Sequence, residues 1–253
     1  MTNTYQFAQV NIAVSSLHDQ LHRLCREYQS PGAEVDFSVE IRQSDIDFEG
    51  KKSEGEREMG DIPIRRFTDP YLETLAVYRK IAERMPEYDT VLFHGSCVAV
   101  DGEGYLFTAK SGTGKSTHTR LWRELLGGRA VMVNDDKPLI RLTDSSPVIY
   151  GTPWDGKHRL SANIAVPLKA ICVLERAEEN TIRRITIQEA YPVLLQQAYR
   201  PADRMAMMKT LALIDWLAAA VQLWRLGCNT DIEAARVAFD SRKGSVCAPE
   251  GRG

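Results

Sequence analysis

The spacing of apolar residues along the chain predicts several strands. Apolar and polar residues alternate over 35–42, which is typical of a strand with one exposed face. Other segments are apolar at nearly every position and therefore predict buried strands: 91–100, 105–107, 130–133, 168–174 and 223–228. Combined with the helical segments between them, these strands indicate an α/β protein.

Helix signals occupy much of the remaining chain. In 69–86, Asp69 is expected to cap a helix, Pro70 suits its first position and Pro86 ends it. Thr186 and Glu189 have capping-box spacing and predict the start of another helix. Further helices are expected at 17–28, from 115 to about 126, at 202–222, and from 231 to about 240.

Two segments carry more specific expectations about exposure. Met205, Met207 and Met208 in the long helix are interpreted as core-filling residues. The charged segment 50–60 is interpreted as a hairpin tip or solvated loop, with a partner contact as the alternative.

A very short connection joins two of the buried strands. The segment 101–104 between 91–100 and 105–107 is a tight turn, so the two strands must be antiparallel neighbours. This hairpin indicates a mixed sheet rather than a wholly parallel one. If Gly102 and Glu103 are the turn residues, His94 lies opposite Ser111.

These elements suggest a division of the chain into three parts. Residues 1–88 are expected to form a small N-terminal α+β module and residues 89–240 the main core. Residues 241–253 are polar and rich in glycine and proline, which is typical of a flexible tail.

Composition excludes some classes of protein and partner. The 253 residues carry a net charge of −2, which does not favour nucleic acid as a partner. The most apolar long run, 211–224, is too short and too polar to span a membrane, and no signal peptide is expected. Five scattered cysteines without metal-binding spacing indicate a cytoplasmic protein with reduced thiols.

The segment 105–117 has the order of a phosphate-binding loop: a buried strand, a loop with two glycines, and a Lys-Ser-Thr that opens a helix. Such a loop points its backbone N–H groups at an anion. Alanine replaces the usual first glycine, which is tolerable at negative φ. The residues expected to hold the nucleotide are Ala109, Lys110, Ser111, Gly112, Thr113, Gly114, Lys115, Ser116 and Thr117.

An acidic pair follows the next buried strand. Asp135 and Asp136 come 19 and 20 residues after Ser116, where a carboxylate that holds Mg²⁺ is expected in a phosphoryl-transfer protein. The predicted Mg²⁺ ligands are Ser116, Asp135 and Asp136. A later polar loop, 152–159, is expected to close over the nucleotide and supply positive charge, or else to be a surface turn anchored by Trp154.

Four short motifs together resemble the HPr serine kinase/phosphorylase family, and in particular its short HPr kinase-like branch. They are 94–96 (His-Gly-Ser), 111–116, 134–136 (Asn-Asp-Asp) and 151–156. The resemblance covers about 89–240 and implies a mixed-sheet P-loop core of the type shared with phosphoenolpyruvate carboxykinase. The longer signature of the bifunctional HPr enzymes is absent, so HPr itself and the reverse phosphorolysis are not expected.

The resemblance also implies roles for individual residues. Asp135 would be the general base, with His94 beside it, and Arg159 or Lys157 would stabilise the transferred group. The cofactors would be ATP and Mg²⁺, and the acceptor a serine-type hydroxyl of a small protein, peptide or metabolite. Relatives are often oligomeric, which makes a homo-oligomer a further expectation.

Two other functions remain open from the sequence. The chain could be a nucleotide-binding regulatory or partner module of a peptide-maturation system that transfers no phosphate. It could also be an enzyme of the carboxykinase type, although no cluster of transition-metal ligands is evident.

Overall fold

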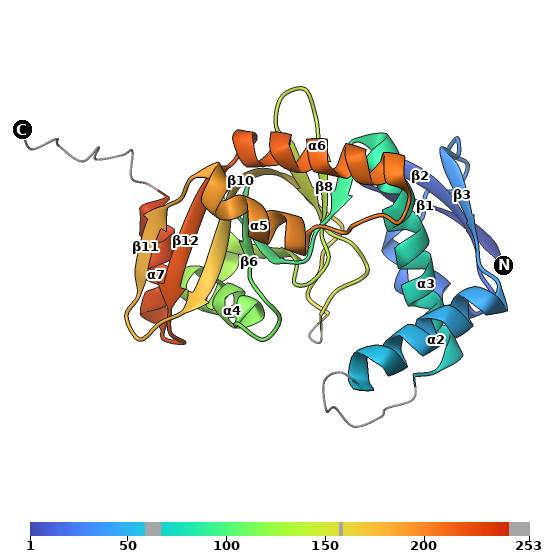
Figure 1. The fold of residues 1–253 in the computed structure, drawn as a ribbon, viewed down its shortest axis with the longest axis horizontal. Coiled ribbons are helices and arrows are strands. Elements are labelled where there is room, and N and C mark those ends of the chain that lie inside the picture. Colours follow the sequence, from blue (N-terminus) through green and yellow to red (C-terminus); the bar gives the residue numbers. More distant parts are fainter. Residues whose placement is uncertain (59–66, 157–158, 243–253) are drawn as a thin grey trace, which may run out of the picture.

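The computed structural model describes residues 1–58, 67–156 and 159–242, with 55–58 described by backbone alone. Two sheets of unequal size organise this part of the chain (Figure 1). The smaller sheet has the order β1-β2-β3, in which β1 (Thr2–Phe7) and β2 (Val10–Ser15) are antiparallel and β3 (Phe37–Glu40) runs parallel to β2.

Three helices accompany the small sheet: α1 (Asp19–Leu24), α2 (Gln43–Glu58) and α3 (Asp69–Arg84). Short 3-10 turns follow α1 at Arg26–Tyr28 and α3 at Met85–Tyr88. Asp69 is the first residue of α3, and Thr68 occupies its N-cap without a side-chain hydrogen bond.

The prediction of a loop or hairpin at 50–60 is wrong through Glu58, because α2 continues to that residue; 59 and 60 lie outside the described residues. Ion pairs hold this helix against α3: Glu49 contacts Arg79 at 2.5 Å and Asp45 contacts Lys80 at 2.7 Å. A helix held by charges lacks the apolar stripe on which sequence interpretation relies.

The larger sheet has nine strands and is mixed, as the hairpin predicts. Its main path runs β4-β8-β9-β10-β6-β5-β7, and β12 pairs with both β10 and β11. The strands are β4 (Thr90–Leu92), β5 (Ser96–Val100), β6 (Glu103–Thr108), β7 (Ala130–Asn134), β8 (Leu139–Leu142), β9 (Pro147–Tyr150), β10 (Ala165–Arg176), β11 (Thr181–Arg184) and β12 (Gln222–Cys228).

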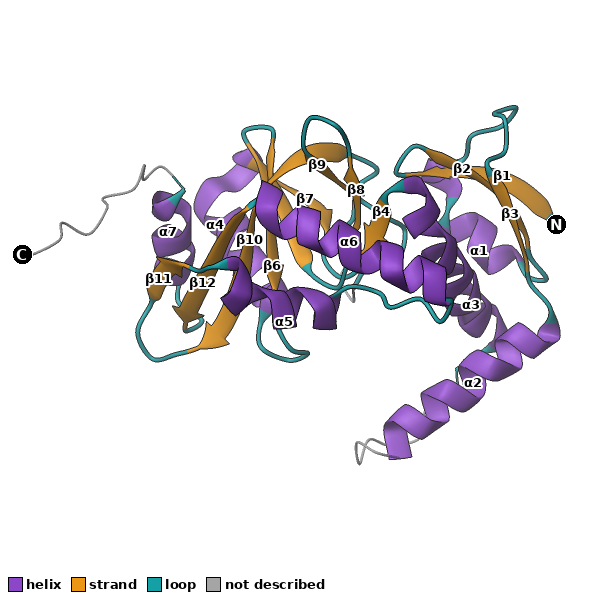
Figure 2. Ribbon diagram, turned by 45° about the horizontal axis from the view of Figure 1, so that its top comes forward, coloured by secondary structure: helices purple, strands orange, loops and turns teal. Residues whose placement is uncertain are grey.

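Helices cover both faces of this sheet (Figure 2). On one face α5 (Ile187–Gln197) and α6 (Arg204–Ala220) bury residues such as Leu194 and Ile214 against the strands. On the other, α4 (Lys115–Leu126) and α7 (Ile232–Ser241) bury Trp122 and Phe239. A 3-10 turn at Gly127–Arg129 connects α4 to β7.

The expected segment 91–100 is not one strand. β4 pairs with β8, whereas β5 pairs with β6 and β7, and the chain breaks between them at 93–95. Hydrogen bonds from the backbone of His94 to Gln197 and of Gly95 to Asp136 replace strand pairing there.

The hairpin register also differs from the prediction. Val100 pairs with Glu103, so the two turn residues are Asp101 and Gly102, with φ of 53° and 83°. Positive φ at both positions is the requirement of a tight two-residue turn, which an Asp-Gly pair meets. His94 consequently lies against Thr108, whose hydroxyl donates to the His94 carbonyl at 3.0 Å, and not opposite Ser111.

Two further expectations are corrected. Met205 and Met208 are 70% and 55% exposed, so they do not fill the core. The helix α7 includes Ser241, and the guanidinium of Arg242 lies 3.8 Å from the ring centroid of Phe239. The predicted tail therefore does not begin at 241; residues 243–253 lie outside the described part.

Candidate active site

The direction of the strands brings the predicted motifs to one edge of the large sheet. β10 is parallel to β6, and β5 is antiparallel to both β6 and β7. The carboxyl ends of β6, β7 and β10 therefore meet at the same edge as the amino end of β5. The phosphate-loop segment follows β6, the acidic pair follows β7, and His94 precedes β5, so all three motifs converge there.

The nine residues expected to hold the nucleotide, 109–117, connect the end of β6 to the first turn of α4. Gly112 and Gly114 have φ of 77° and 119°, values that L side chains rarely adopt. Ala109 is buried and is not among the residues with positive φ, so alanine in place of glycine fits this loop. Lys110 and Ser111 are exposed at the tip of the loop.

The side chain of Lys115 folds back across the base of the loop. It is 8% exposed, and its ammonium donates to the Ala109 carbonyl at 3.1 Å. Burial lowers the pKa of Lys115, and the charge of Asp136 opposes that effect. The ammonium is thus held where an anion bound in the loop would contact it.

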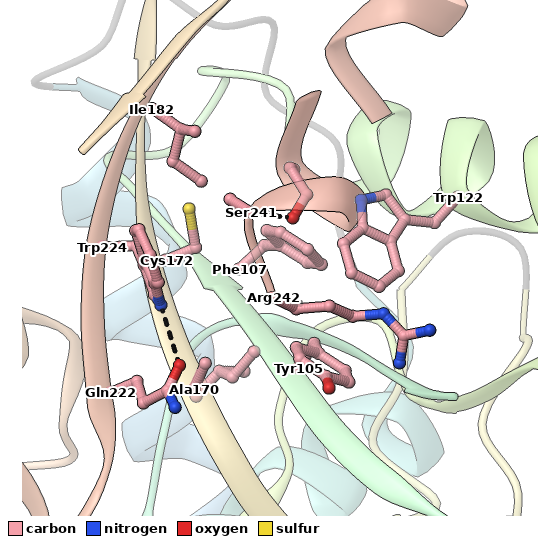
Figure 3. Close-up of a pocket in the computed structure, with 12 residues that line it drawn as sticks. Tyr105, Phe107, Trp122, Ala170, Cys172, Ile182, Gln222, Trp224, Ser241 and Arg242 are labelled. Carbon is pink, nitrogen blue, oxygen red and sulfur yellow. Dashed lines mark hydrogen bonds between the residues drawn. The ribbon is translucent and has the colours of Figure 1, made fainter. Parts of the chain in front are cut away.

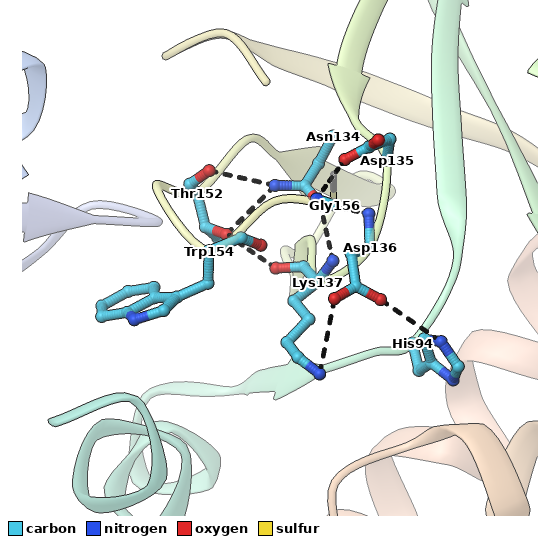
Figure 4. A network of polar contacts seen from close by, with 8 residues as sticks. All are labelled: His94, Asn134, Asp135, Asp136, Lys137, Thr152, Trp154 and Gly156. Atoms are coloured by element: carbon cyan, nitrogen blue, oxygen red, sulfur yellow. Dashed lines mark hydrogen bonds and ion pairs between the residues drawn. The ribbon is translucent and has the colours of Figure 1, made fainter. Parts of the chain in front are cut away.

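A buried asparagine shapes the acidic turn after β7 (Figure 4). The side-chain oxygen of Asn134 (Oδ1) accepts hydrogen bonds from the backbone N–H of Asp136 at 2.8 Å and from that of Lys137 at 2.6 Å. Its amide donates to the carbonyl and the hydroxyl of Thr152 at 3.0 and 3.1 Å. The turn is therefore fixed to the 151–156 loop, and the direction of both carboxylates is fixed with it.

Asp135 points into this loop and is 4% exposed. Its carboxylate accepts a hydrogen bond from the backbone N–H of Gly156. A Cβ at Gly156 would lie 2.7 Å from a carboxylate oxygen of Asp135, closer than real Cβ contacts. Only glycine allows the loop to approach the carboxylate this closely.

Asp136 lies between two basic side chains. His94 Nε2 is 3.3 Å from one of its oxygens, and the ammonium of Lys137 is 3.6 Å from the other. Burial favours a higher pKa for Asp136, but the hydrogen bond from His94 and the charges of Lys137, His94 and Lys115 outweigh it, so the pKa is lowered. The Asp136 carboxylate is therefore ionised at neutral pH.

The two other cations expected in the site, Arg159 and Lys157, belong to the loop after Gly156. Arg159 is exposed, and its backbone N–H donates to the Gly156 carbonyl at 3.2 Å. Lys157 lies outside the described residues.

His118, expected to be structural, is buried on α4, where its ring accepts from the indole N–H of Trp122 at 3.1 Å. Burial lowers the pKa of His118 to about 4, so it is neutral.

Sequence interpretation missed several residues of the site. Arg176 at the end of β10 donates to the Gly112 carbonyl at 2.6 Å and so braces the loop tip. Lys137 follows the acidic pair directly, and its ammonium lies 5.2 Å from the ring centroid of Tyr78. The direct succession of Lys137 after the acidic pair was a usable signal, whereas Arg176 required knowledge of the strand order.

Two hollows differ in size and position. Beside Ser116 and Asp135 lies a depression of about 350 Å³, large enough for a small molecule. A second, apolar hollow lies between the sheet and α7 (Figure 3), but it measures only about 20 Å³ and has room for about one water molecule. The first hollow is the candidate binding site because it adjoins the phosphate-loop segment and the acidic turn.

No family model and no curated protein matches this chain. Among solved structures, the chain is similar to the Hpr(Ser) kinase/phosphatase from Coxiella burnetii. The identity is 11%, the match covers 60% of this chain and 96% of that chain, and the TM-score is 0.34. A likeness of this size carries no functional conclusion.

Two negative observations concern the described residues. None of their helices is both long enough and apolar enough to cross a bilayer. They also contain no group of three or more His, Cys, Asp and Glu side chains that could hold a metal ion.

Proposed function

We propose that this protein is an ATP- and Mg²⁺-dependent kinase that transfers the γ-phosphoryl group to a serine-type hydroxyl. The observation that carries the proposal is the convergence of the Lys115 loop and the buried Asp135 carboxylate at one edge of the sheet. Phosphoryl transfer depends mainly on positioning and on neutralisation of charge, and these two elements supply both.

The loop backbone and Lys115 would bind the phosphates. Asp135 would accept the proton of the acceptor hydroxyl. The hydroxyl oxygen would then bond to the γ-phosphorus while the bond between the γ-phosphorus and the bridging β-phosphate oxygen breaks, which releases ADP. His94 contacts the Asp136 carboxylate and would thereby help to fix the acidic turn. Arg159 or Lys157 would stabilise charge on the transferred group.

The residues present fit a magnesium ion. Ser116 at the start of α4 and Asp135 at the end of β7 line the same depression, and Asp136 follows directly. Mg²⁺ is commonly held by one or two carboxylates with substrate phosphates. When bound, it would neutralise charge on the phosphates.

The test follows γ-labelled ATP or GTP with Mg²⁺ into a panel of acceptors: free serine, serine-containing peptides and HPr. Asp135→Asn keeps an oxygen for the Gly156 N–H, so we expect retained nucleotide binding and transfer reduced by about 10²-fold or more. Lys115→Ala should weaken both binding and transfer. Asp144→Asn, at an exposed turn, is the matched control.

The outcomes separate the candidate functions. Equal transfer by Asp135→Asn would remove Asp135 from the role of base. Tight nucleotide binding without transfer to any acceptor would favour a regulatory module instead of a kinase. Absence of nucleotide binding would contradict the proposal as a whole.

A further inference from the structure

The depression beside the site extends away from the phosphate loop along one face of α4. Ser116 and Asp135 line it at the end nearest the loop, and Thr117, Arg120, Arg123 and Leu160 line the remainder together with neighbouring residues. Ser116, Arg120 and Arg123 are spaced by four and three residues, which places them on the same face of the helix. The hollow is therefore continuous with the point at which phosphate would be transferred.

The charges in this hollow are unevenly placed. Asp135 is the acidic residue of its lining, and Arg120 and Arg123 are the basic ones. Arg120 is exposed and contacts Glu124 at 2.5 Å. Arg123 is half-buried, and within the described ranges it has no ion-pair partner. A half-buried guanidinium without a carboxylate partner is suited to bind one from a ligand.

The position of Arg123 relative to Asp135 indicates which of the two substrates, the nucleotide or the acceptor, its guanidinium would face. The phosphates would be bound by the loop backbone and Lys115, which lie on the β6 side of Ser116. Asp135, as the base, must contact the acceptor hydroxyl. Because Asp135 and Arg123 line one hollow, the part of the acceptor next to its hydroxyl would extend toward Arg123.

We propose that the acceptor carries a free carboxylate close to its hydroxyl, and that Arg123, assisted by Arg120, binds this carboxylate. The proposal rests on the proposed kinase function and specifies its substrate class. Without these cations, an anionic acceptor would be repelled by Asp135. Met132 and Leu160, which also line the hollow, would contact the carbon skeleton.

A serine unit with a free carboxylate has this chemistry, and it can come from two sources. One is the free amino acid, and the other is a peptide that ends in serine. The experiment therefore compares L-serine with L-serinamide, and a serine-terminated peptide acid with the same peptide amidated. The source is the compound, L-serine or the peptide acid, whose kcat/KM is the larger of the two and exceeds that of its own amide.

Kinetics are measured for the wild type, Arg123→Gln, Arg123→Lys and, as a control, Arg129→Gln, which alters an exposed arginine beyond the end of α4. The wild type should prefer the acid over the amide by roughly tenfold or more in kcat/KM, the loss expected for a charge-assisted hydrogen bond. Arg123→Gln should abolish this preference without changing the KM for ATP, Arg123→Lys should restore part of it, and the control should retain it.

Equal kcat/KM for acids and amides in the wild type would overturn the inference and leave the kinase function intact. A raised KM for ATP in Arg123→Gln, with the preference unchanged, would also overturn it and assign Arg123 to the nucleotide. Calorimetric titration of L-serine and of the serine-terminated peptide acid, each beside its amide, into the protein with ADP and Mg²⁺ detects the carboxylate site without transfer. Failure of both acids to bind there would overturn the inference, whereas absence of ADP binding would contradict the proposed function.

Discussion

Asn134 uses its whole amide group to hold the acidic turn. It is fully buried, and it makes two hydrogen bonds as acceptor and two as donor. Because a buried polar group that loses its partner is costly, the identity of this residue matters as much as that of the carboxylates that follow it.

Asn134→Ala should lower the free energy of unfolding by at least about 2 kcal/mol, since it leaves buried backbone groups without partners. Denaturant titration measures the change. Asn163→Ala is the matched control because that exposed side chain makes one hydrogen bond, to the Glu27 carbonyl, and its loss should cost less than about 1 kcal/mol. A loss of similar size in both variants would contradict the role of Asn134.

Asp136 should make stability depend on pH in one direction. Its pKa is lower in the folded chain than the usual value of about 3.9, so ionised Asp136 stabilises the fold above that value. This stabilisation is lost as the pH falls through the lowered pKa. We therefore expect the wild type to exceed Asp136→Asn in unfolding free energy at pH 6, and the difference to shrink below about pH 4.

Denaturant midpoints of both proteins between pH 3 and pH 7 provide the measurement. A difference that stays constant or grows as the pH falls would show that His94 and Lys137 do not stabilise the ionised carboxylate.

At the scale of elements, the N-terminus of α5 forms the capping box that its sequence predicts. The Thr186 hydroxyl accepts from the Glu189 N–H at 3.3 Å, and the Glu189 carboxylate accepts from the Thr186 N–H at 3.0 Å. The cap is exposed and lies away from the phosphate loop, so its effect on stability can be separated from function.

Thr186→Ala should reduce the free energy of unfolding by about 1 kcal/mol and leave nucleotide binding unchanged. Thr186→Ser keeps the hydroxyl and should lose less than half as much. Thermal unfolding followed by circular dichroism, beside nucleotide titration, tests both points. Weakened nucleotide binding in the alanine variant would mean that α5 also supports the site.

The elements also show which features the sequence could predict. Four of the buried strands (105–107, 130–133, 168–174 and 223–228), the helix after the phosphate loop and the α5 cap depend on local patterns, and the structure has them close to the expected places, whereas β1, β2 and β8 were not predicted. The hairpin register was missed although an Asp-Gly turn signal was present at 101–102. The exposure of Met205 and Met208 could not be predicted, because an apolar helical segment does not reveal which face meets the core.

At the scale of the whole molecule, one side chain joins the small sheet to the site. Trp154 packs against Phe7 of β1 and Tyr78 of α3, with ring centroids 5.3 and 5.6 Å apart, and its indole donates to the Thr74 carbonyl at 3.0 Å. Gly156, two residues later, contacts Asp135. No local pattern predicts this arrangement, since Trp154 is 76 residues from Tyr78 and 147 residues from Phe7 along the chain.

Trp154→Ala should cost about 3–5 kcal/mol, the range for truncation of a buried aromatic residue, and should reduce phosphoryl transfer by displacing Gly156 from Asp135. The measurement is chemical denaturation combined with the transfer assay. Trp216→Ala, on the partly exposed face of α6, is the control and should cost less than about 1 kcal/mol. Unchanged transfer in a folded Trp154→Ala protein would show that the loop does not depend on this anchor.

The position of Trp154 also has a consequence for the order of folding. The core of the small sheet includes Leu139, Tyr150 and Trp154 beside residues of β1 and β2. During synthesis, the packing around Phe7 cannot be completed until residue 154 has left the ribosome. A nascent chain that has emerged only to α3 would thus expose an unfinished apolar surface, and chaperone binding is expected to be concentrated in that interval.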